Sequence, residues 1–431
     1  MPVAHGNDIL SQAEPPISDL FVTEHFGPGC DAADVLTSKA LSLPRGGVTM
    51  RVLATHCAGS SVHEVGGYSV RISDAIDDPE WDDYLERTPL CAYTQASCWG
   101  RVRAFTGWRP ARVVVSEHDR IVAGVQILTR PLPAGGSVGR VSWGPVVRED
   151  APELVELVFD EMLALGKAYN VQYLVVHPPR GGDWMCAELA RRGFRPSLQE
   201  IEYTATVCVD LEANADELLA RMSRRCREHI KLAERRGVTV RRASEADLPI
   251  FNQLKDAHCA RLGYSRRDER YYAELWAALA PRGHIELFLA EYDGVPISAE
   301  MAIVFGDTSY HHERLWSGQH GDLRPNEILE WYAFKWAKAE GYRWVDLVGI
   351  QRSVAEAMIA GDRAPAQLTS AESFKLRLGA EPILLPEGYD YVYNSALRFV
   401  HRSIPSEALT SGTLRGLVDR ISLRAWGGRK T

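Results

Sequence analysis

The stretch from Thr308 to Gly349 reads TSYHHERLWSGQHGDLRPNEILEWYAFKWAKAEGYRWVDLVG and determines the fold that we expect. Its alternating start, Thr308 to Trp316, predicts a half-buried strand. A loop with glycines follows, from Gly318 to Arg324. Pro325 and Asn326 suit the start of a helix, because proline has no amide hydrogen to lose and asparagine can cap a helix.

The second half of the stretch predicts a helix and a further strand. Apolar residues recur at helical spacing from Ile328 to Ala337, Gly341 ends the helix, and residues 345–348 form a short buried strand. This arrangement places backbone amides and a helix dipole where an anionic group can bind. We therefore expect an acyl donor that carries phosphate to bind here. The candidate substrate contacts in the stretch are Tyr310, Gln319, Arg324 and Asn326.

The bulk composition is that of an ordinary globular protein. The 431 residues favour two or three domains, and 45% are hydrophobic and 25% charged. No apolar run reaches the roughly 18 residues of a membrane span, and the N-terminus lacks the features of a signal peptide. The eight cysteines include no CxxC pair, which predicts reduced thiols in a cytoplasmic protein. No spacing of His, Cys or carboxylates indicates a metal site.

Positive charge is concentrated in one segment, although the net charge of the chain is -8. Residues 221–242 hold nine Arg or Lys against two Glu, and a local patch of this kind can bind a polyanion. Arg224, Arg227 and Lys231 share one helix face and suit phosphate groups. A solvated helix face is the other interpretation. A second basic and aromatic cluster suits either an acceptor pocket or a solvated surface, and consists of Arg261, Tyr264, Arg266 and Arg267.

The order of predicted elements occurs twice along the chain. Strands and helices that begin at Ala111, Ile121, Ala151 and Val171 have counterparts at His284, Pro296, Pro325 and Arg343, 172–175 residues later. Two copies of one strand-and-helix unit explain this offset. We expect an irregular extension at residues 1–66, a first domain at 67–212, a second domain at 213–394 and a basic tail at 395–431. A hairpin is expected at His118 and Asp119, and the strand from Ile201 to Val209 is expected to complete the first unit.

The repeated element order is that of the GNAT acyltransferase fold, and short motifs add a narrower resemblance. In the second half these motifs are Arg224–Lys231, Gly237-Val238, Leu287–Ala290, Asp293-Gly294, Pro325-Asn326 with Leu329 and Trp331, Asp346–Gly349, Phe374-Lys375 and Leu378-Gly379. In the first half they are Gln95, Ser97 and Trp99, together with Gly144-Pro145.

Over residues 68–393 the chain resembles the Fem-type family of aminoacyl-tRNA-dependent transferases. The resemblance implies an α/β (α+β) protein of two tandem GNAT-like domains, each a mixed, mostly antiparallel sheet flanked by helices. It also implies aminoacyl-tRNA as co-substrate and no other cofactor. The chain departs from the family in lacking a long helical hairpin. It also has Ser142-Trp143-Gly144-Pro145 where the family often has Pro-Arg-Gly-Pro.

The resemblance implies catalytic roles for Phe374 and Lys375, because the matching pair lies at the aminoacyl-tRNA end of the family's site. An ammonium group beside a carbonyl and a terminal phosphate can stabilise negative charge on both. A surface lysine beside a core phenylalanine is the alternative. Glu313 and Asp346 are further catalytic candidates, either to orient or deprotonate the amine or as paired structural carboxylates. His311 and His312 are strand neighbours and are not expected to face the pocket together.

We expect an aminoacyltransferase that forms an amide bond on an amine of a peptidoglycan precursor or of a specialised-metabolite intermediate. An N-acyltransferase that uses acyl-coenzyme A on the same fold is one alternative. However, neither loop before the two main helices, residues 319–326 and 147–150, has the Gln/Arg-x-x-Gly-x-Gly/Ala pattern typical of a coenzyme A site. A non-catalytic tRNA-binding or scaffold protein is the other alternative. No sequence pattern indicates a covalent enzyme intermediate.

Overall fold

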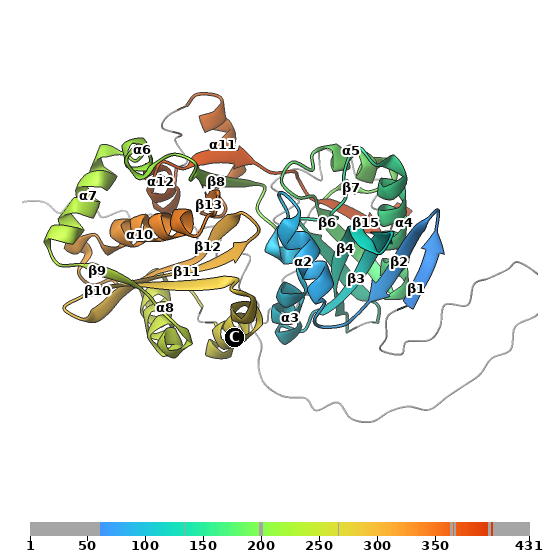
Figure 1. Ribbon diagram of the computed structural model, residues 1–431, viewed down its shortest axis with the longest axis horizontal. Coiled ribbons are helices and arrows are strands. Elements are labelled where there is room, and N and C mark those ends of the chain that lie inside the picture. The colour runs from blue at the N-terminus through green and yellow to red at the C-terminus, as the bar shows by residue number, and fades with distance from the viewer. Residues whose placement is uncertain are drawn as a thin grey trace, which may run out of the picture.

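The computed structural model describes residues 61–133, 135–197, 201–265, 267–362, 365, 368–394 and 398–399. Two sheets lie side by side, each with its own helices (Figure 1). Most of the predicted extension and of the predicted tail lies outside the described residues. The extension was predicted to be irregular as far as residue 66, but Ser61–Val65 forms strand β1. It pairs with β2 across a turn in which Gly66 and Gly67 have positive φ, which glycine adopts without strain.

The first sheet has the strand order β1-β2-β3-β4-β5-β6-β15-β7, in which only β5 and β6 are parallel neighbours. Its strands are β1 Ser61–Val65, β2 Tyr68–Ser73, β3 Arg109–Glu117, β4 Arg120–Pro131, β5 Ser137–Ser142, β6 Val171–His177, β7 Arg195–Pro196 and β15 Tyr389–Val392. Its helices are α2 Pro79–Arg87, η1 Tyr93–Gln95, α3 Ser97–Phe105, α4 Pro152–Ala168 and α5 Trp184–Arg191. The predicted hairpin is confirmed, since β3 and β4 are joined by His118 and Asp119.

The second sheet has the order β14-β8-β13-β12-β11-β10-β9, in which only β12 and β13 are parallel neighbours. Its strands are β8 Ala205–Asp210, β9 Thr239–Arg242, β10 Ile285–Tyr292, β11 Val295–Phe305, β12 Thr308–Trp316, β13 Trp344–Asp346 and β14 Glu381–Leu384. Its helices are α6 Ala215–Arg221, α7 Arg224–Arg235, η2 Glu245–Asp247, α8 Leu248–Leu262, α9 Glu269–Leu279, η3 Ala280–Arg282, η4 Gly321–Leu323, α10 Pro325–Ala339, α11 Arg352–Ile359 and α12 Ser370–Arg377. The predicted fold of two repeated units is confirmed, whereas α11 was not predicted.

The two sheets exchange strands across the predicted boundary at residues 212 and 213. The strand predicted to complete the first unit is β8, and it pairs with β13 and β14 in the second sheet. In return β15, predicted to belong to the second unit, pairs with β6 and β7 in the first sheet. Figure 1 shows β8 in green among orange strands and β15 in red beside β6. The division between the sheets therefore does not follow chain order.

One of the apolar clusters of the protein spans the boundary between the two units. Buried side chains of α2 and α3 pack against those of α8, α9, β11 and β12, and they include Trp81, Trp99, Phe251, Tyr272 and Phe305. At the edge of this interface Arg282 forms ion pairs with Asp83 and Glu86 of α2. Apolar burial and charge pairing thus hold the units against each other.

The start of α10 differs in detail from the prediction. The helix begins at Pro325 as expected, but its N-cap residue is Arg324, which has φ 58°. Asn326 was predicted as a possible cap, but it lies within the first turn, where its Oδ1 accepts a hydrogen bond of 2.7 Å from Ser298 Oγ. The predicted basic helix is also interrupted, because α6 ends at Arg221 with Met222 as its C-cap, and Ser223 caps the start of α7.

Candidate active site

A pocket of about 370 Å³ lies between the two units. The first unit and the segment after it contribute Tyr93, Thr94, Trp99, Arg103, Arg140, Ile201, Glu202 and Tyr203. The helices α8 and α9 contribute His258, Arg261, Leu262 and Tyr271. The rest of the wall is His311–Trp316, Asn326, Leu347–Gly349, Ser370, Ala371, Phe374 and Lys375. Much of this wall comes from the stretch Thr308 to Gly349.

The pocket opens where two parallel strands of the second sheet separate. Strands β12 and β13 pair only from Thr308 to Tyr310, opposite residues 344–346. Beyond Tyr310, β12 continues to Trp316 alongside β11, whereas the chain after β13 turns away through Val348, which has φ 53°. The separation leaves side chains of β12 facing the loop 347–349 across the pocket.

Lys375 is held at the base of this opening by the loop after β13. Its Nζ donates to the carbonyl oxygens of Val348 and Gly349 over 2.9 and 2.8 Å. Burial and the nearby positive charge of Arg314 lower the pKa of Lys375 to about 8, against the opposing charge of Asp346. The predicted alternative of a surface lysine does not fit, because Lys375 is buried in the pocket wall and lies next to Phe374 in that wall.

Arg314 supplies a second positive charge, which was not predicted from the sequence. Its guanidinium lies 4.2 Å from the centre of the Phe374 ring. Its Nη1 donates to Glu330 Oε1 over 2.7 Å, and Glu330 is fully buried. A guanidinium stacked on a ring and fixed by a carboxylate is well oriented to bind an anionic group in the pocket.

Glu313 lies in the pocket wall as an ionised, paired carboxylate. It accepts 2.8 Å from Lys255 Nζ and 3.0 Å from Tyr272 OH. Burial opposes its charge, but Lys255 and other nearby cations outweigh this effect and lower the pKa of Glu313 to about 2. A carboxylate with so low a pKa is a weak general base near neutral pH. Its environment suits orienting an amine better than deprotonating one.

Both His311 and His312 contribute to the pocket wall, so the expectation that only one would do so is wrong. The register explains the difference. Met301 of β11 pairs with Glu313 and Ala302 pairs with His311, which leaves His312 as the extra residue of a β-bulge. Burial lowers the pKa of His312 to about 4, so its imidazole is neutral at neutral pH.

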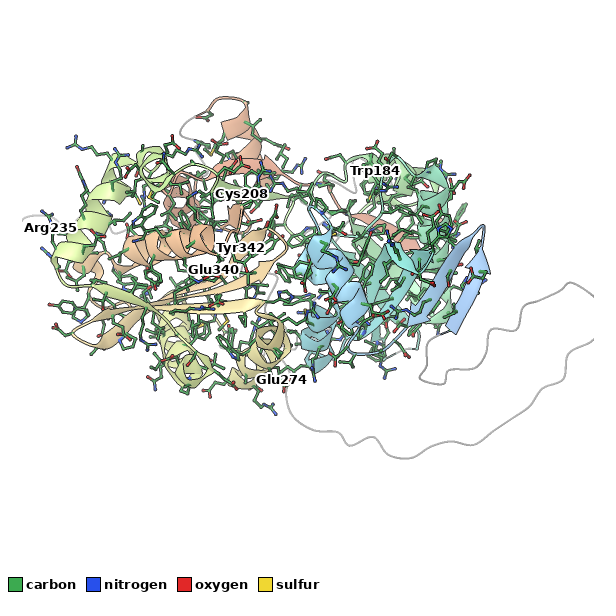
Figure 2. All side chains as sticks on the ribbon, viewed as in Figure 1. Trp184, Cys208, Arg235, Glu274, Glu340 and Tyr342 are labelled. Carbon is green, nitrogen blue, oxygen red and sulfur yellow. The ribbon has the colours of Figure 1, made fainter. Side chains whose placement is uncertain are left out.

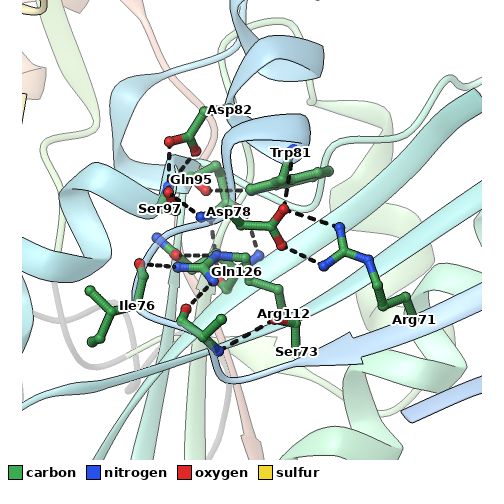
Figure 3. Close-up of polar contacts among 11 residues, drawn as sticks. Arg71, Ser73, Ile76, Asp78, Trp81, Asp82, Gln95, Ser97, Arg112 and Gln126 are labelled. Carbon is green, nitrogen blue, oxygen red and sulfur yellow. Dashed lines mark hydrogen bonds and ion pairs between the residues drawn. The ribbon is translucent and has the colours of Figure 1, made fainter. Parts of the chain in front are cut away.

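A buried polar network fixes the first-unit side of the pocket (Figure 3). Arg112 is fully buried, and its Nε donates to Gln126 Oε1 over 2.9 Å. Gln126 N donates to Gln95 Oε1 over 2.8 Å, and Asp82 accepts 2.6 Å from Ser97 Oγ. These bonds anchor residues 93–99, which carry three of the pocket residues. Gln95 and Ser97, which carried the resemblance in this half, are thus structural.

The other predicted residues lie in three settings. Arg261 and Asn326 line the pocket, and Arg261 stacks 4.8 Å from the Trp316 ring. Asp346 and Tyr310 lie behind the wall. Asp346 accepts from Thr206 Oγ1 and Val348 N, and Tyr310 packs 5.1 Å from the ring of Tyr93. The third group contributes nothing to the pocket wall and consists of Tyr264, Gln319, Arg324 and the residues of the basic helix, whereas Arg266 is outside the described residues.

The basic helix α7 lies at the outer side of the second unit. Figure 2 shows Arg235 at the edge of the molecule that is far from the first unit. Arg224 is exposed and pairs with Glu228, whereas Arg227 donates to carbonyl oxygens at the end of α6. Lys231 is exposed. The helix is therefore a separate basic surface rather than part of the pocket.

One group of described side chains has the donor atoms to hold a metal ion. These are Glu300, His311 and Glu330, whose ligand-type atoms all lie within 4.8 Å of one another. They come from β11, β12 and α10, so no short sequence spacing connects them. The sequence feature that could have indicated this group is a glutamate inside each of two strongly apolar segments, PISAEMAIVF and ILEWYAF. None of the helices in the described part of the chain has the length and apolar character of a membrane span.

Comparisons with known proteins agree with this architecture. A family model described as the FemAB family matches residues 76–294, just over half of the chain. The solved structure of FemX superposes with a TM-score of 0.67 at 20% identity, over 75% of this chain and 97% of that one. At this identity the likeness shows the fold, which is the tandem GNAT-like fold expected from the sequence.

Curated relatives match over a similar extent of sequence. A lipid II:glycine glycyltransferase of Staphylococcus aureus (strain MRSA252) is 27% identical over 229 residues, which cover 51% of this chain and 54% of the relative. The protein of the same name from Staphylococcus saprophyticus is 26% identical over 237 residues, which cover 52% and 57%. The chain thus spans about half the length of the curated relatives that it matches.

Proposed function

Because the chain belongs to the FemAB family, we propose that it is an aminoacyltransferase that moves an amino acid from aminoacyl-tRNA to an amine. The amine attacks the ester carbonyl carbon of the donor, and the amide bond forms as the carbon–oxygen bond of the ester breaks. The ester oxygen of the tRNA leaves with the electron pair of the broken bond and takes up the proton that the amine loses, which leaves a free ribose hydroxyl. The acceptor is the amine of a peptidoglycan precursor or of a specialised-metabolite intermediate. The names of the curated relatives support the first of these.

The observation that carries the proposal is Lys375 in the pocket where β12 and β13 separate. A transferase of this kind needs positive charge beside the carbonyl oxygen on which negative charge develops. Lys375 Nζ has two carbonyl acceptors, and Arg314 lies close enough to lower its pKa. With a pKa of about 8, the ammonium form predominates at pH 7 and stabilises that charge.

The two walls of the pocket suit two substrates. Phe374, Lys375 and Arg314 form the wall on the side of α12 and suit the ester and phosphate of a tRNA end. Tyr93 and Trp99 come from the first unit and offer aromatic surface to an acceptor. The exposed face of α7, with Arg224 and Lys231, suits more distant phosphates of the same tRNA. Charged tRNA as the donor places the reaction in the cytoplasm.

A direct assay tests this proposal. Purified protein is mixed with charged tRNA and either a peptidoglycan precursor or a small amine, and the amide product is detected by mass spectrometry. Product that disappears after ribonuclease treatment is the expected result. A parallel reaction contains acyl-coenzyme A in place of charged tRNA. Product that forms equally well in this reaction after ribonuclease treatment would assign the acyl-coenzyme A activity instead. Tight tRNA binding without any product would indicate a binding protein.

A further inference from the structure

A cluster of buried, charged side chains lies beneath the pocket and comes from β11, β12 and α10. Figure 1 shows α10 lying along the sheet that contains these two strands. Glu300 and Glu330 are fully buried, and the side chain of His311 is 2% exposed. His311 Nδ1 and Glu330 Oε2 are 2.7 Å apart. Arg314 pairs with the other oxygen of Glu330. His311 and Arg314 also line the pocket, so the cluster lies directly under its floor.

The β-bulge of β12 brings these groups to one face of the sheet. His311 and Arg314 are three residues apart, so a regular strand would point them to opposite faces. The extra residue His312 changes this, because His311 pairs with Ala302 and Arg314 pairs with Glu300. Residues 300 and 302 are two apart on β11 and share a face, so their partners on β12 share that face as well. Glu300, His311 and Arg314 therefore face α10 together, where Glu330 lies opposite.

Polar atoms in this cluster lack the hydrogen bonds that burial normally requires. In the part of the chain that the structure describes, neither carboxylate oxygen of Glu300 has a hydrogen-bond partner, and neither does His311 Nε2. A buried carboxyl group without a partner is costly, which points to a ligand for it.

We propose that Glu300, His311 and Glu330 form a binding site for one divalent first-row transition ion of the zinc type. One imidazole nitrogen and two carboxylate oxygens are a common donor set for such ions. Donor atoms around one such ion lie roughly 3.3 Å apart, so atoms within 4.8 Å need only small side-chain shifts.

The same donor set disfavours two other ions. Magnesium prefers six oxygens in octahedral geometry and gives up water reluctantly, and calcium takes six to eight oxygens. Imidazole instead favours transition ions. An ion here would fasten β11, β12 and α10 below the pocket, and through Glu330 it would hold Arg314 in place. This inference does not rest on the proposed function, because binding is measured without either substrate.

The test uses the full chain after removal of metal with a chelator. Zinc is titrated with the bound metal quantified, and cobalt is titrated as a spectroscopic probe. We expect one equivalent of either ion per chain, visible ligand-field bands for cobalt, and a raised melting temperature. Coordination by nitrogen and oxygen gives no thiolate charge-transfer band in the near ultraviolet, which separates this site from the free cysteines of the chain.

Two variants and a matched control connect the signal to the cluster. Glu300→Gln keeps the size of the side chain, and His311→Gln removes the imidazole. Each should weaken binding by at least about 100-fold, because loss of a ligand exceeds the 10–100-fold typical of losing an outer-shell partner. His312→Gln, at the neighbouring position, should bind as the wild type does. Circular dichroism checks the fold, so a misfolded His311→Gln still leaves Glu300→Gln to decide.

Two results would overturn the proposal of a metal site. The first is a wild-type chain that binds no zinc or cobalt at micromolar concentrations. The second is binding that persists unchanged in folded Glu300→Gln.

Discussion

The two units contain corresponding pairs of parallel strands, but the extent of pairing differs between them. In the first unit β5 and β6 pair along the whole of β5, from Ser137 to Ser142. In the second unit the corresponding β12 and β13 pair over three residues, and β12 then continues alone on that side for six more. The pocket occupies the resulting gap. The parallel strand pair is thus continuous in the first unit, whereas in the second unit it separates and leaves room for the pocket.

The two units also differ in whether their buried charged side chains have hydrogen-bond partners. In the first unit, Arg112 is satisfied by Gln126 and by the carbonyl oxygens of Ala75 and Ile76. In the second unit, Glu300 is equally buried but has no hydrogen-bond partner among the described residues. A satisfied network stabilises the fold, whereas an unsatisfied group indicates a place where a ligand completes the structure. Changes in the first unit should therefore reduce stability, and changes around the pocket should reduce activity.

The largest expected effect is that of Lys375→Ala on turnover. Loss of a positive charge beside the reacting carbonyl should lower kcat about 100- to 1000-fold, as removal of one oxyanion-stabilising group does in other enzymes. The melting temperature should change little, since water from the pocket can reach the two carbonyl oxygens left behind. Lys335→Ala, an exposed position on α10, is the control and should keep wild-type turnover. Full activity of Lys375→Ala would remove this residue from the mechanism.

Arg112→Leu should have the largest effect on stability. It leaves Gln126 Oε1 and two carbonyl oxygens buried without their donor, which should lower the free energy of unfolding by about 3 kcal/mol. Urea denaturation followed by circular dichroism measures the change. Arg109→Leu, exposed on the same strand, should change stability by less than about 0.5 kcal/mol. Equal effects of the two substitutions would show that the network does not stabilise the first unit.

Arg314→Gln should raise KM for the aminoacyl donor about tenfold. It removes one charge-assisted contact, and a loss of about 1.4 kcal/mol of binding free energy corresponds to a factor of about ten. It should also shift the pH profile. Activity that needs the ammonium form of Lys375 falls as pH rises through the pKa of about 8. Arg314 lowers that pKa, so its removal raises the pKa and moves the alkaline limb to higher pH. Initial rates between pH 6 and 10 measure both effects, and an unmoved alkaline limb would contradict the coupling.

The smallest expected effect is that of Tyr272→Phe, which tests a satisfied pair within the second unit. Tyr272 OH donates to the buried carboxylate of Glu313, which keeps Lys255 as a partner. Loss of one hydrogen bond of two should cost about 1 kcal/mol, less than Arg112→Leu. The free energy of unfolding in urea gives the difference. Tyr271→Phe is the matched control, since no hydrogen bond of its hydroxyl is found in the described part of the chain, and should be nearly neutral.

Much of the fold was predictable because it depends on local pattern. The apolar spacing in residues 328–337, the proline at 325 and the glycine at 341 defined α10 closely, and the repeat offset defined the second copy of each element. The exchange of β8 and β15 was not predictable, because both strands are short and their residue pattern carries no information about which sheet they join.

The candidate site was predictable only in part. Phe374 and Lys375 were identified through a resemblance and lie in the pocket. Arg314, Glu330 and Glu300 were missed, because their meeting depends on a bulge at His312 and on packing of α10 against the sheet. Gln319 and Arg324 were expected to contact a substrate because they precede a helix N-terminus, but the pocket wall reaches that helix only at Asn326. Sequence order shows which side chains are near a helix end, but not which of them face a cavity.

The exchanged strands have a consequence for synthesis on the ribosome. The first sheet has β15 between β6 and β7, and β15 is formed by Tyr389–Val392, near the end of the described chain. Until these residues emerge, β6 presents an unpaired edge through translation of the whole second unit. Such an edge can pair wrongly with other chains. The nascent first unit therefore has to stay soluble with an incomplete sheet until β15 has emerged and paired with β6 and β7.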